Sequence, residues 1–350
     1  MMQANVEDAM RLAARGDFAG AGRVLAEFVA SHPKDADARY RLGVVLMRQG
    51  ELTQAAASVE AAIRLDGTQA SYHLALGEIA LRVPDHAKAV AAAGRAAKLA
   101  GGNVALWRAI ATVQQRAGDG IGEARSLQSL LRLTPEDRAP YARLSALLLD
   151  HRTADGALAV AEAGVRRFAR DAELWRLHGL AAYAMGRKED ALRSFLRAID
   201  ADPKDPVGYA SLETLLPEAG GLAPEIEKRL VPFARRDPIG HFLLALLLPD
   251  QREAHLREVT ARAPEFWPGR YETGRLLQER GQRAEAVAEF EAVLRLNAGH
   301  AESHYALSQL LPEREQALAH RREHHRLKQA AASAERARAA AKPRISVSVQ

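Results

Sequence analysis

A chain of 350 residues without a single cysteine excludes disulfides, thiolate metal sites and a cysteine nucleophile. Its longest apolar run, 242–248, is far shorter than the ~20 residues that a membrane-spanning helix needs. The formal net charge of +5 equals the excess of basic over acidic residues in 313–344 alone, so the rest of the chain is balanced and only its C-terminal segment is basic.

The N-terminal segment, which includes Glu7 and Asp8, contains no apolar stretch of the kind that forms the core of a signal peptide. We therefore expect a protein without a transmembrane segment that is cytoplasmic, or periplasmic if a leader peptide has been removed. The strong helix formers Ala, Leu, Arg and Glu are abundant, and β-branched residues are sparse until the last few positions.

From the N-terminus onward, a small residue recurs at a fixed interval of 34, which is the signature of a repeat architecture. These small residues are Ala9, Gly43, Gly77, Ala111, Ser145 and Gly179. The same interval separates the aromatic residues Trp107, Tyr141 and Trp175. Alanines return at Ala21, Ala55, Ala89, Ala157 and Ala191. Six units therefore follow one register: 2–35, 36–69, 70–103, 104–137, 138–171 and 172–205.

The unit 172–205, AELWRLHGLAAYAMGRKEDALRSFLRAIDADPKD, carries the complete pattern. Gly179 permits two helices to approach closely, Gly186 suits a helix C-terminus, and Pro203 stops the second helix. With their apolar i, i+3, i+4 stripe, these residues resemble the tetratricopeptide repeat family. The resemblance implies an all-α fold, a right-handed α-solenoid of helix-turn-helix repeats. It also implies a chain that binds other proteins.

The register fails after 205, because Glu213 stands where a small residue is expected and prolines interrupt the segment up to 264. We interpret 206–238 and a shortened 239–264 as irregular helix pairs, and regular repeats resume at 267–300. The predicted organisation has four parts: six regular repeats (1–205), irregular helical pairs (206–266), resumed repeats with a capping helix (267–330) and a basic, partly disordered tail (331–350).

An arginine row, Arg48, Arg82 and Arg116, repeats at an interval of 34 near the end of three successive first helices. In the family that the chain resembles, the first helices line a concave groove. Further groove candidates are Tyr40, Arg41, Met47, Arg108, Arg143, Arg176 and Tyr183. A row of guanidinium groups suits an acidic partner through bidentate hydrogen bonds. The alternative is that each arginine only complements the dipole at the end of its own helix.

The segment from His320 to His324, HRREH, matches the H-x-x-E-H pattern of one class of zinc enzymes. Zinc needs a third protein ligand, and the only acidic residue after this segment is Glu335. We therefore predict a solvated terminal helix and no metal site. The chain has no Gly-rich phosphate loop, nucleophile elbow or Rossmann fingerprint, so we predict no enzymatic activity and no cofactor.

The leading functional hypothesis is a non-catalytic scaffold or adaptor that binds a protein or peptide in the concave groove. One alternative is a structural component of a bacterial envelope or polysaccharide-export assembly. Another is a nucleic-acid-associated regulator that acts through the basic tail. The segment after Tyr305 has no aromatic residue to stack on bases, so nucleic acid is the disfavoured partner.

Overall fold

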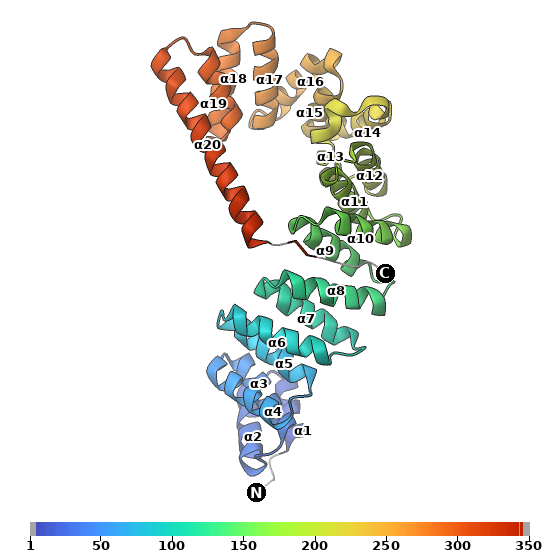
Figure 1. Ribbon diagram of the computed structural model, residues 1–350, viewed down its shortest axis with the longest axis vertical. Helices are drawn as coiled ribbons and strands as arrows, with labels where there is room; N and C mark the ends of the chain where they lie inside the picture. Colours follow the sequence, from blue (N-terminus) through green and yellow to red (C-terminus); the bar gives the residue numbers. More distant parts are fainter. Residues whose placement is uncertain (1–4, 343, 346–350) are drawn as a thin grey trace. The chain divides into compact units, whose positions relative to one another are not determined.

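The structure is a computed structural model that describes residues 5–342 and 344–345. Every regular element among these residues is a helix, which confirms the all-α prediction (Figure 1). The chain forms two compact units. Unit 1 consists of residues 1–148 with 345–350, and unit 2 consists of residues 149–344.

Unit 1 is a series of helices in which consecutive helices pack against each other from α1 to α8. They are α1 (Val6–Ala14), α2 (Phe18–Ser31), α3 (Ala36–Gln49), α4 (Leu52–Leu65), α5 (Ala70–Arg82), α6 (His86–Leu99), α7 (Val104–Ala117) and α8 (Gly120–Leu133). Helix α9 (Arg138–Asp150) begins in unit 1 and ends in unit 2. The first helices α3, α5 and α7 also contact one another in sequence, so they form one layer.

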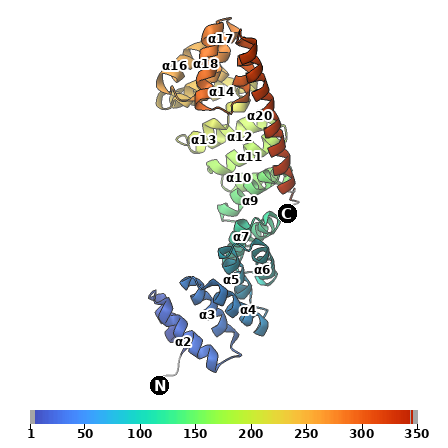
Figure 2. The same cartoon turned by 90° about the vertical axis from the view of Figure 1, so that its left-hand side faces the viewer.

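Unit 2 continues the helix-turn-helix pattern with a less regular centre. Its helices are α10 (Ala154–Arg167), α11 (Ala172–Ala184), α12 (Lys188–Ala201), α13 (Pro206–Ala210), α14 (Ala223–Arg236), α15 (Pro238–Leu247), α16 (Arg252–Arg262), α17 (Trp267–Glu279), α18 (Arg283–Leu296), α19 (Ala301–Leu310) and α20 (Arg314–Ala341). Three short 3-10 helices, η1 (Glu213–Glu218), η2 (Gly220–Leu222) and η3 (Pro249–Gln251), interrupt the series. Figure 2 shows the same helices from the side.

The recurring small residues lie where two helices of one repeat touch. A Cβ atom added at Gly43 would lie 2.5 Å from Cγ2 of Val59, and one added at Gly179 would lie 2.4 Å from Cε1 of Phe195. Both distances are far below van der Waals contact, so a side chain larger than hydrogen does not fit there. Gly186, which follows the C-cap residue Met185 of α11, has a φ of 76°, which is the left-handed conformation that ends many helices.

A second recurring position supplies a hydrogen-bond donor that ties each repeat to the loop before it. In every case the side chain contacts the carbonyl oxygen of the residue six positions earlier. The eight side chains are those of Arg39, His73, Trp107, Tyr141, Trp175, Tyr209, Arg270 and His304. Because their chemical types differ, only Trp107, Tyr141 and Trp175 were identified from the sequence, which did not reveal the donor role.

The irregular centre of unit 2 starts later than the sequence predicted. Tyr209 lies 34 residues after Trp175 and makes the same contact to a loop carbonyl, so the repeat register continues through α13. Helix α13 then ends after five residues, and the chain continues as η1 and η2. The ring of Tyr209 stacks on Phe233 of α14 at 3.9 Å between centroids, which closes this shortened pair.

The boundaries of the two compact units differ from the four predicted parts. The division after residue 148 falls inside the predicted block of six regular repeats. Residues 331–341, predicted to belong to a partly disordered tail, are the last part of α20. Their Ala- and Arg-rich composition has a high helix propensity, which explains this difference. Ile345, the last residue that the structure describes, is buried.

No described helix combines the length and the apolar character that crossing a membrane requires.

Candidate partner-binding surface

The arginine row of unit 1 lies in the last turns of α3, α5 and α7, as its spacing predicted. Arg48 and Arg116 are exposed, and neither makes an ion pair or side-chain hydrogen bond with another described residue. Arg82 differs, because its Nη1 donates a hydrogen bond to the carbonyl oxygen of Met47 at 3.0 Å. Arg82 therefore joins α5 to the C-terminal turn of α3, and only the two outer arginines of the row are unpaired.

The other candidates on α3 have different environments. Tyr40 stacks on Tyr72 of α5 at 4.7 Å between centroids, and burial raises the pKa of the Tyr40 hydroxyl, with the charges of Glu78 and Asp37 adding to the effect. Arg41 forms an ion pair with Asp37 at 2.5 Å. Both Tyr40 and Arg41 are partly exposed, and either could contribute to a contact only after rearranging its present partner.

Met47 was predicted to line the groove, and the structure corrects this. Its side chain is only 3% exposed and packs in the core of unit 1 with Ala55, Val59 and Ile79. The reason is the orientation of the last turn of α3, in which Arg48 faces solvent while its neighbour faces α4 and α5.

Arg108 and Arg143, both predicted groove residues, lie on the same small cavity of about 210 Å³. Arg108 on α7 contacts Asp137 at 2.8 Å. Arg143 on α9 holds Glu123 of α8 with two hydrogen bonds, at 2.6 and 3.1 Å. Each guanidinium therefore already has a carboxylate partner, and the cavity carries no unbalanced charge from these pairs.

Glu123 was not identified from the sequence as a functional or structural residue. It lies 34 residues after Ala89 and 34 before Ala157, so it replaces the small residue that this position has in neighbouring repeats. Its side chain is buried, whereas that of Arg143 is 41% exposed. The break in the alanine pattern was the available signal, because a buried carboxylate requires a partner.

In unit 2, the two predicted groove residues lie on α11 without forming a cluster. Arg176 is half-buried and makes no side-chain ion pair with another described residue. Tyr183 is 40% exposed. Whether either residue contacts a partner stays a prediction.

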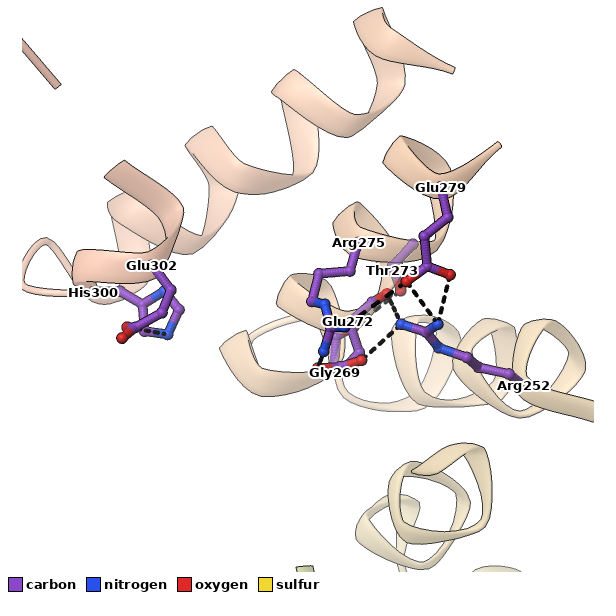
Figure 3. A network of polar contacts seen from close by, with 8 residues as sticks. All are labelled: Arg252, Gly269, Glu272, Thr273, Arg275, Glu279, His300 and Glu302. Carbon is purple, nitrogen blue, oxygen red and sulfur yellow. Dashed lines mark hydrogen bonds and ion pairs between the residues drawn. The ribbon is translucent and has the colours of Figure 1, made fainter. Parts of the chain in front are cut away.

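A network of ion pairs in unit 2 joins α16 to α17 (Figure 3). Arg252 contacts Glu272 at 2.8 Å and Glu279 at 2.9 Å, and Arg275 contacts Glu272 from the other side at 3.1 Å. Glu272 is only 8% exposed, so its charge depends on these two cations. Burial, together with the charge of Glu272, raises the pKa of Glu213. The network fixes the packing of α16 on α17.

A larger cavity, of about 520 Å³, lies beside the same two helices. Its wall includes the apolar residues Leu256, Leu276 and Leu277. The cations at its rim, Arg257 and Arg280, both contact Glu253, at 2.5 and 2.7 Å. The sequence did not predict this cavity, because it arises from the spacing between helices of different repeats.

The histidines of the H-x-x-E-H segment do not converge on one point. His320 contacts His304 of α19 through their Nδ1 atoms at 2.8 Å, whereas His324 contacts the carbonyl oxygen of Ala301 at 2.9 Å. Glu323 is paired with Arg326 on the same helix. No group of three or more potential metal ligands occurs in the part of the chain that the structure describes.

The sequence pattern of the family described as tetratricopeptide repeat matches residues 7–70, 46–104, 143–206 and 271–319, which together are more than half of the chain. No curated protein sequence matches this chain significantly.

Several solved structures are similar in fold. One is YrrB, described as a TPR protein with an unusual peptide-binding site (19% identity, 53% of this chain and 96% of that chain, TM-score 0.44). Another is pilF of Pseudomonas aeruginosa (16% identity, 60% of this chain and 95% of that chain, TM-score 0.39). A third is the TPR domain of P58(IPK) (15% identity, 93% of this chain and 97% of that chain, TM-score 0.30). Similarity at this level concerns the helical fold alone.

Proposed function

Because the chain belongs to the tetratricopeptide repeat family, we propose that it is a non-catalytic scaffold that binds an acidic segment of a partner protein on unit 1. The surface that we propose, the α3–α5–α7 face, is centred on Arg48 and Arg116. The observation that supports it is that these two cations are exposed and make no ion pair or side-chain hydrogen bond with another described residue, at equivalent positions of α3 and α7, the first helices on either side of α5.

The energetics of the proposed contact are modest for each residue. An ion pair between solvent-exposed groups contributes about 0–1 kcal/mol, because water screens both charges. Two such pairs cannot hold a partner alone, so a partner would also need apolar or aromatic contacts. The partly exposed ring of Tyr40 on α3, which is held in place by its stacking on Tyr72 of α5, offers such a contact.

The alternative role for the basic C-terminal segment, nucleic-acid binding, has less support. Several of its cations already contact carboxylates: Arg326 with Glu323, Lys328 with Glu302, Lys342 with Asp150 and Arg344 with Asp155. A nucleic acid would have to compete with these partners for the positive charge. We therefore favour a protein partner.

The test begins with capture of partners from a cell lysate by the immobilised protein and their identification by mass spectrometry. The affinity of a captured partner is then measured for the parent and for Arg48→Gln/Arg116→Gln. We expect binding to weaken by up to about 25-fold, since two pairs are lost and each contributes at most ~1 kcal/mol. Arg82 is left unchanged, because it bonds to Met47 and its removal would disturb α3 and α5.

The matched control is Arg64→Gln/Arg95→Gln, which removes two exposed arginines of the second helices α4 and α6 that make no ion pair with another described residue. It changes the net charge of unit 1 by the same amount on a different set of helices. The control should bind like the parent. Equal affinities for the parent and the Arg48→Gln/Arg116→Gln protein would refute the proposed surface. If both double variants weaken binding equally, the effect of the arginines is one of net charge and does not locate the binding surface.

A further inference from the structure

The last helix of unit 2 is twice as long as its position in a repeat requires. The second helices α10, α12 and α18 have 14 residues each, whereas α20 has 28, or about 42 Å at 1.5 Å per residue. Its first part packs on α19, where Lys328 contacts Glu302 at 2.6 Å. The part beyond Lys328 has no repeat partner, and all residues from 328 to 338 are exposed.

The far end of α20 nevertheless has partners within unit 2, at the connection between α9 and α10. Lys342 forms an ion pair with Asp150, Arg344 contacts Asp155 at 3.5 Å, and the Glu335 carboxylate lies 3.6 Å from Arg152. We call these three pairs the latch. Figures 1 and 2 both show α20 running from α19 back to this connection.

The latch leaves open space between α20 and the connection. A cavity of about 560 Å³ lies there, and its lining includes Leu149, Ala331, Ala334 and Arg338. The alanines of α20 therefore do not pack against the α9–α10 connection. Each of the three contacts that form the latch is an ion pair.

Asp150 is central to the latch. It lies 34 residues after Arg116, so the position of the arginine row carries the opposite charge in the next repeat. The hydrogen bond from Lys342 and the charge of that ammonium group lower the pKa of Asp150. The negative charge of Asp150 therefore complements the positive charges at the basic end of α20.

These observations describe a helix that keeps its own structure and is held at both ends. Alanine-rich sequence stabilises the exposed part of α20 without a core. Exposed ion pairs contribute little each and weaken as salt shortens the Debye length from about 30 Å at 0.01 M to about 3 Å at 1 M. The free-energy difference between the closed and the open state of such a latch is therefore small, and added salt can change its sign.

We propose that residues 328–342, together with Arg344, form an electrostatic strap that closes unit 2 by docking its basic end on Asp150 and Asp155. With the latch closed, α20 spans the arc of helices from α10 to α19 (Figure 1). A polypeptide that binds the side of the arc facing α20 has to open the latch first. Closure itself is independent of the function proposed for unit 1, and its test requires no partner.

The absence of cysteine from the chain makes the test direct, because two introduced cysteines can be spin-labelled selectively. The reporter protein is Arg170→Cys/Ala340→Cys, with one label between α10 and α11 and the other at the end of α20, both at exposed positions. At low salt we expect pulsed electron paramagnetic resonance to show a narrow distribution of distances between the two labels. At about 1 M salt it should broaden towards longer distances.

Three charge variants of the reporter protein identify the latch. Lys342→Glu should reduce the ratio of closed to open molecules by up to about fivefold for each lost pair. Adding Asp150→Lys to Lys342→Glu should restore closure by exchanging the two charges. Arg336→Glu is the matched control, since Arg336 lies on the exposed part of α20 and makes no ion pair with another described residue.

A second labelled pair, Arg170→Cys/Gln309→Cys, reports on the arc of helices without the strap. The distances between these two labels should not respond to salt or to Lys342→Glu. The proposal is overturned if the reporter distribution is already broad at low salt, or if Lys342→Glu and 1 M salt leave it unchanged. It is also overturned if Arg336→Glu opens the strap as much as Lys342→Glu does, because the latch residues would then have no special role.

Discussion

At the scale of single residues, the closest contacts in the repeats determine which positions tolerate change. Gly179 faces the ring of Phe195, which is only 2% exposed and is therefore enclosed by other atoms. Gly94, on α6, is also helical, but apart from its chain neighbours and the nearby backbone of α6, no heavy atom of a described residue lies within 4 Å of the place that a side-chain carbon would take there. A larger residue is therefore excluded at Gly179 and accommodated at Gly94.

We expect Gly179→Leu to destabilise unit 2 by at least ~1–3 kcal/mol, the usual cost of overpacking. Gly94→Ala should instead stabilise unit 1 by about 0.5–1 kcal/mol, because alanine restricts the unfolded chain and favours the helix. Thermal unfolding of both variants and the parent checks the signs. A parental melting temperature for Gly179→Leu would show that α11 and α12 are not in close contact at this point.

The buried pair of Glu123 and Arg143 gives a second prediction at this scale. Removing Arg143 leaves a buried carboxylate without its partner, whereas removing Glu123 leaves an arginine that is 41% exposed and can reach water. We therefore expect Arg143→Met to destabilise unit 1 more than Glu123→Ala, by at least ~1 kcal/mol. Denaturant unfolding of the two variants measures this order, and the reverse order would contradict the assigned burial.

At the scale of elements, two histidine pairs connect neighbouring helices. His241 of α15 and His255 of α16 lie 3.1 Å apart through their Nδ1 atoms, and His304 and His320 make the same contact between α19 and α20. Such a contact requires one ring to donate and the other to accept, so it is lost when both rings are protonated. Burial lowers the pKa of His241, His255 and His320, and the neighbouring histidine lowers it further for His255 and His320.

A histidine whose pKa is lower in the folded state binds fewer protons there than in the unfolded chain. The free energy of unfolding should therefore fall as the pH drops through the ordinary histidine value of about 6.5 towards the lower folded values. We expect His255→Asn to flatten this dependence in the melting of unit 2. His86→Asn, at an exposed position, is the control and should keep the parental pH profile.

At the scale of the whole molecule, stability is distributed over interfaces between neighbouring helices. Nearly all the packing joins helices that are adjacent in the chain, as expected for a repeat protein. Damage at one interface should therefore spread only to the next repeats.

Hydrogen exchange measured by mass spectrometry tests this locality. In Gly179→Leu, we expect faster exchange in peptides from α10 to α13 and parental exchange in peptides from α2 to α4. Gly43→Leu, which fills the contact with Val59, should produce the reverse pattern. Uniformly faster exchange in either variant would indicate a single cooperative unit instead.

The sequence determined the helical repeats of this protein because their signals are local. Gly179 and Gly186 mark a close contact and a helix end, and each acts through residues less than one repeat away. The 34-residue interval also placed Arg48, Arg82 and Arg116 correctly in the last turns of successive first helices. The register at Tyr209 was missed although an aromatic residue stands there 34 positions after Trp175, because Glu213 and the prolines that follow break the pattern of small residues.

Only the tertiary structure decided which of the predicted surface residues pair with another residue of the protein. Arg82 bonds to Met47, Arg143 to Glu123 and Lys342 to Asp150, over separations of 35, 20 and 192 residues. Such pairings depend on how helices of different repeats are oriented, and a periodic sequence gives every repeat the same local signal. The sequence therefore determined where the helices form, and packing determined which charges are neutralised within the protein and which remain for a partner.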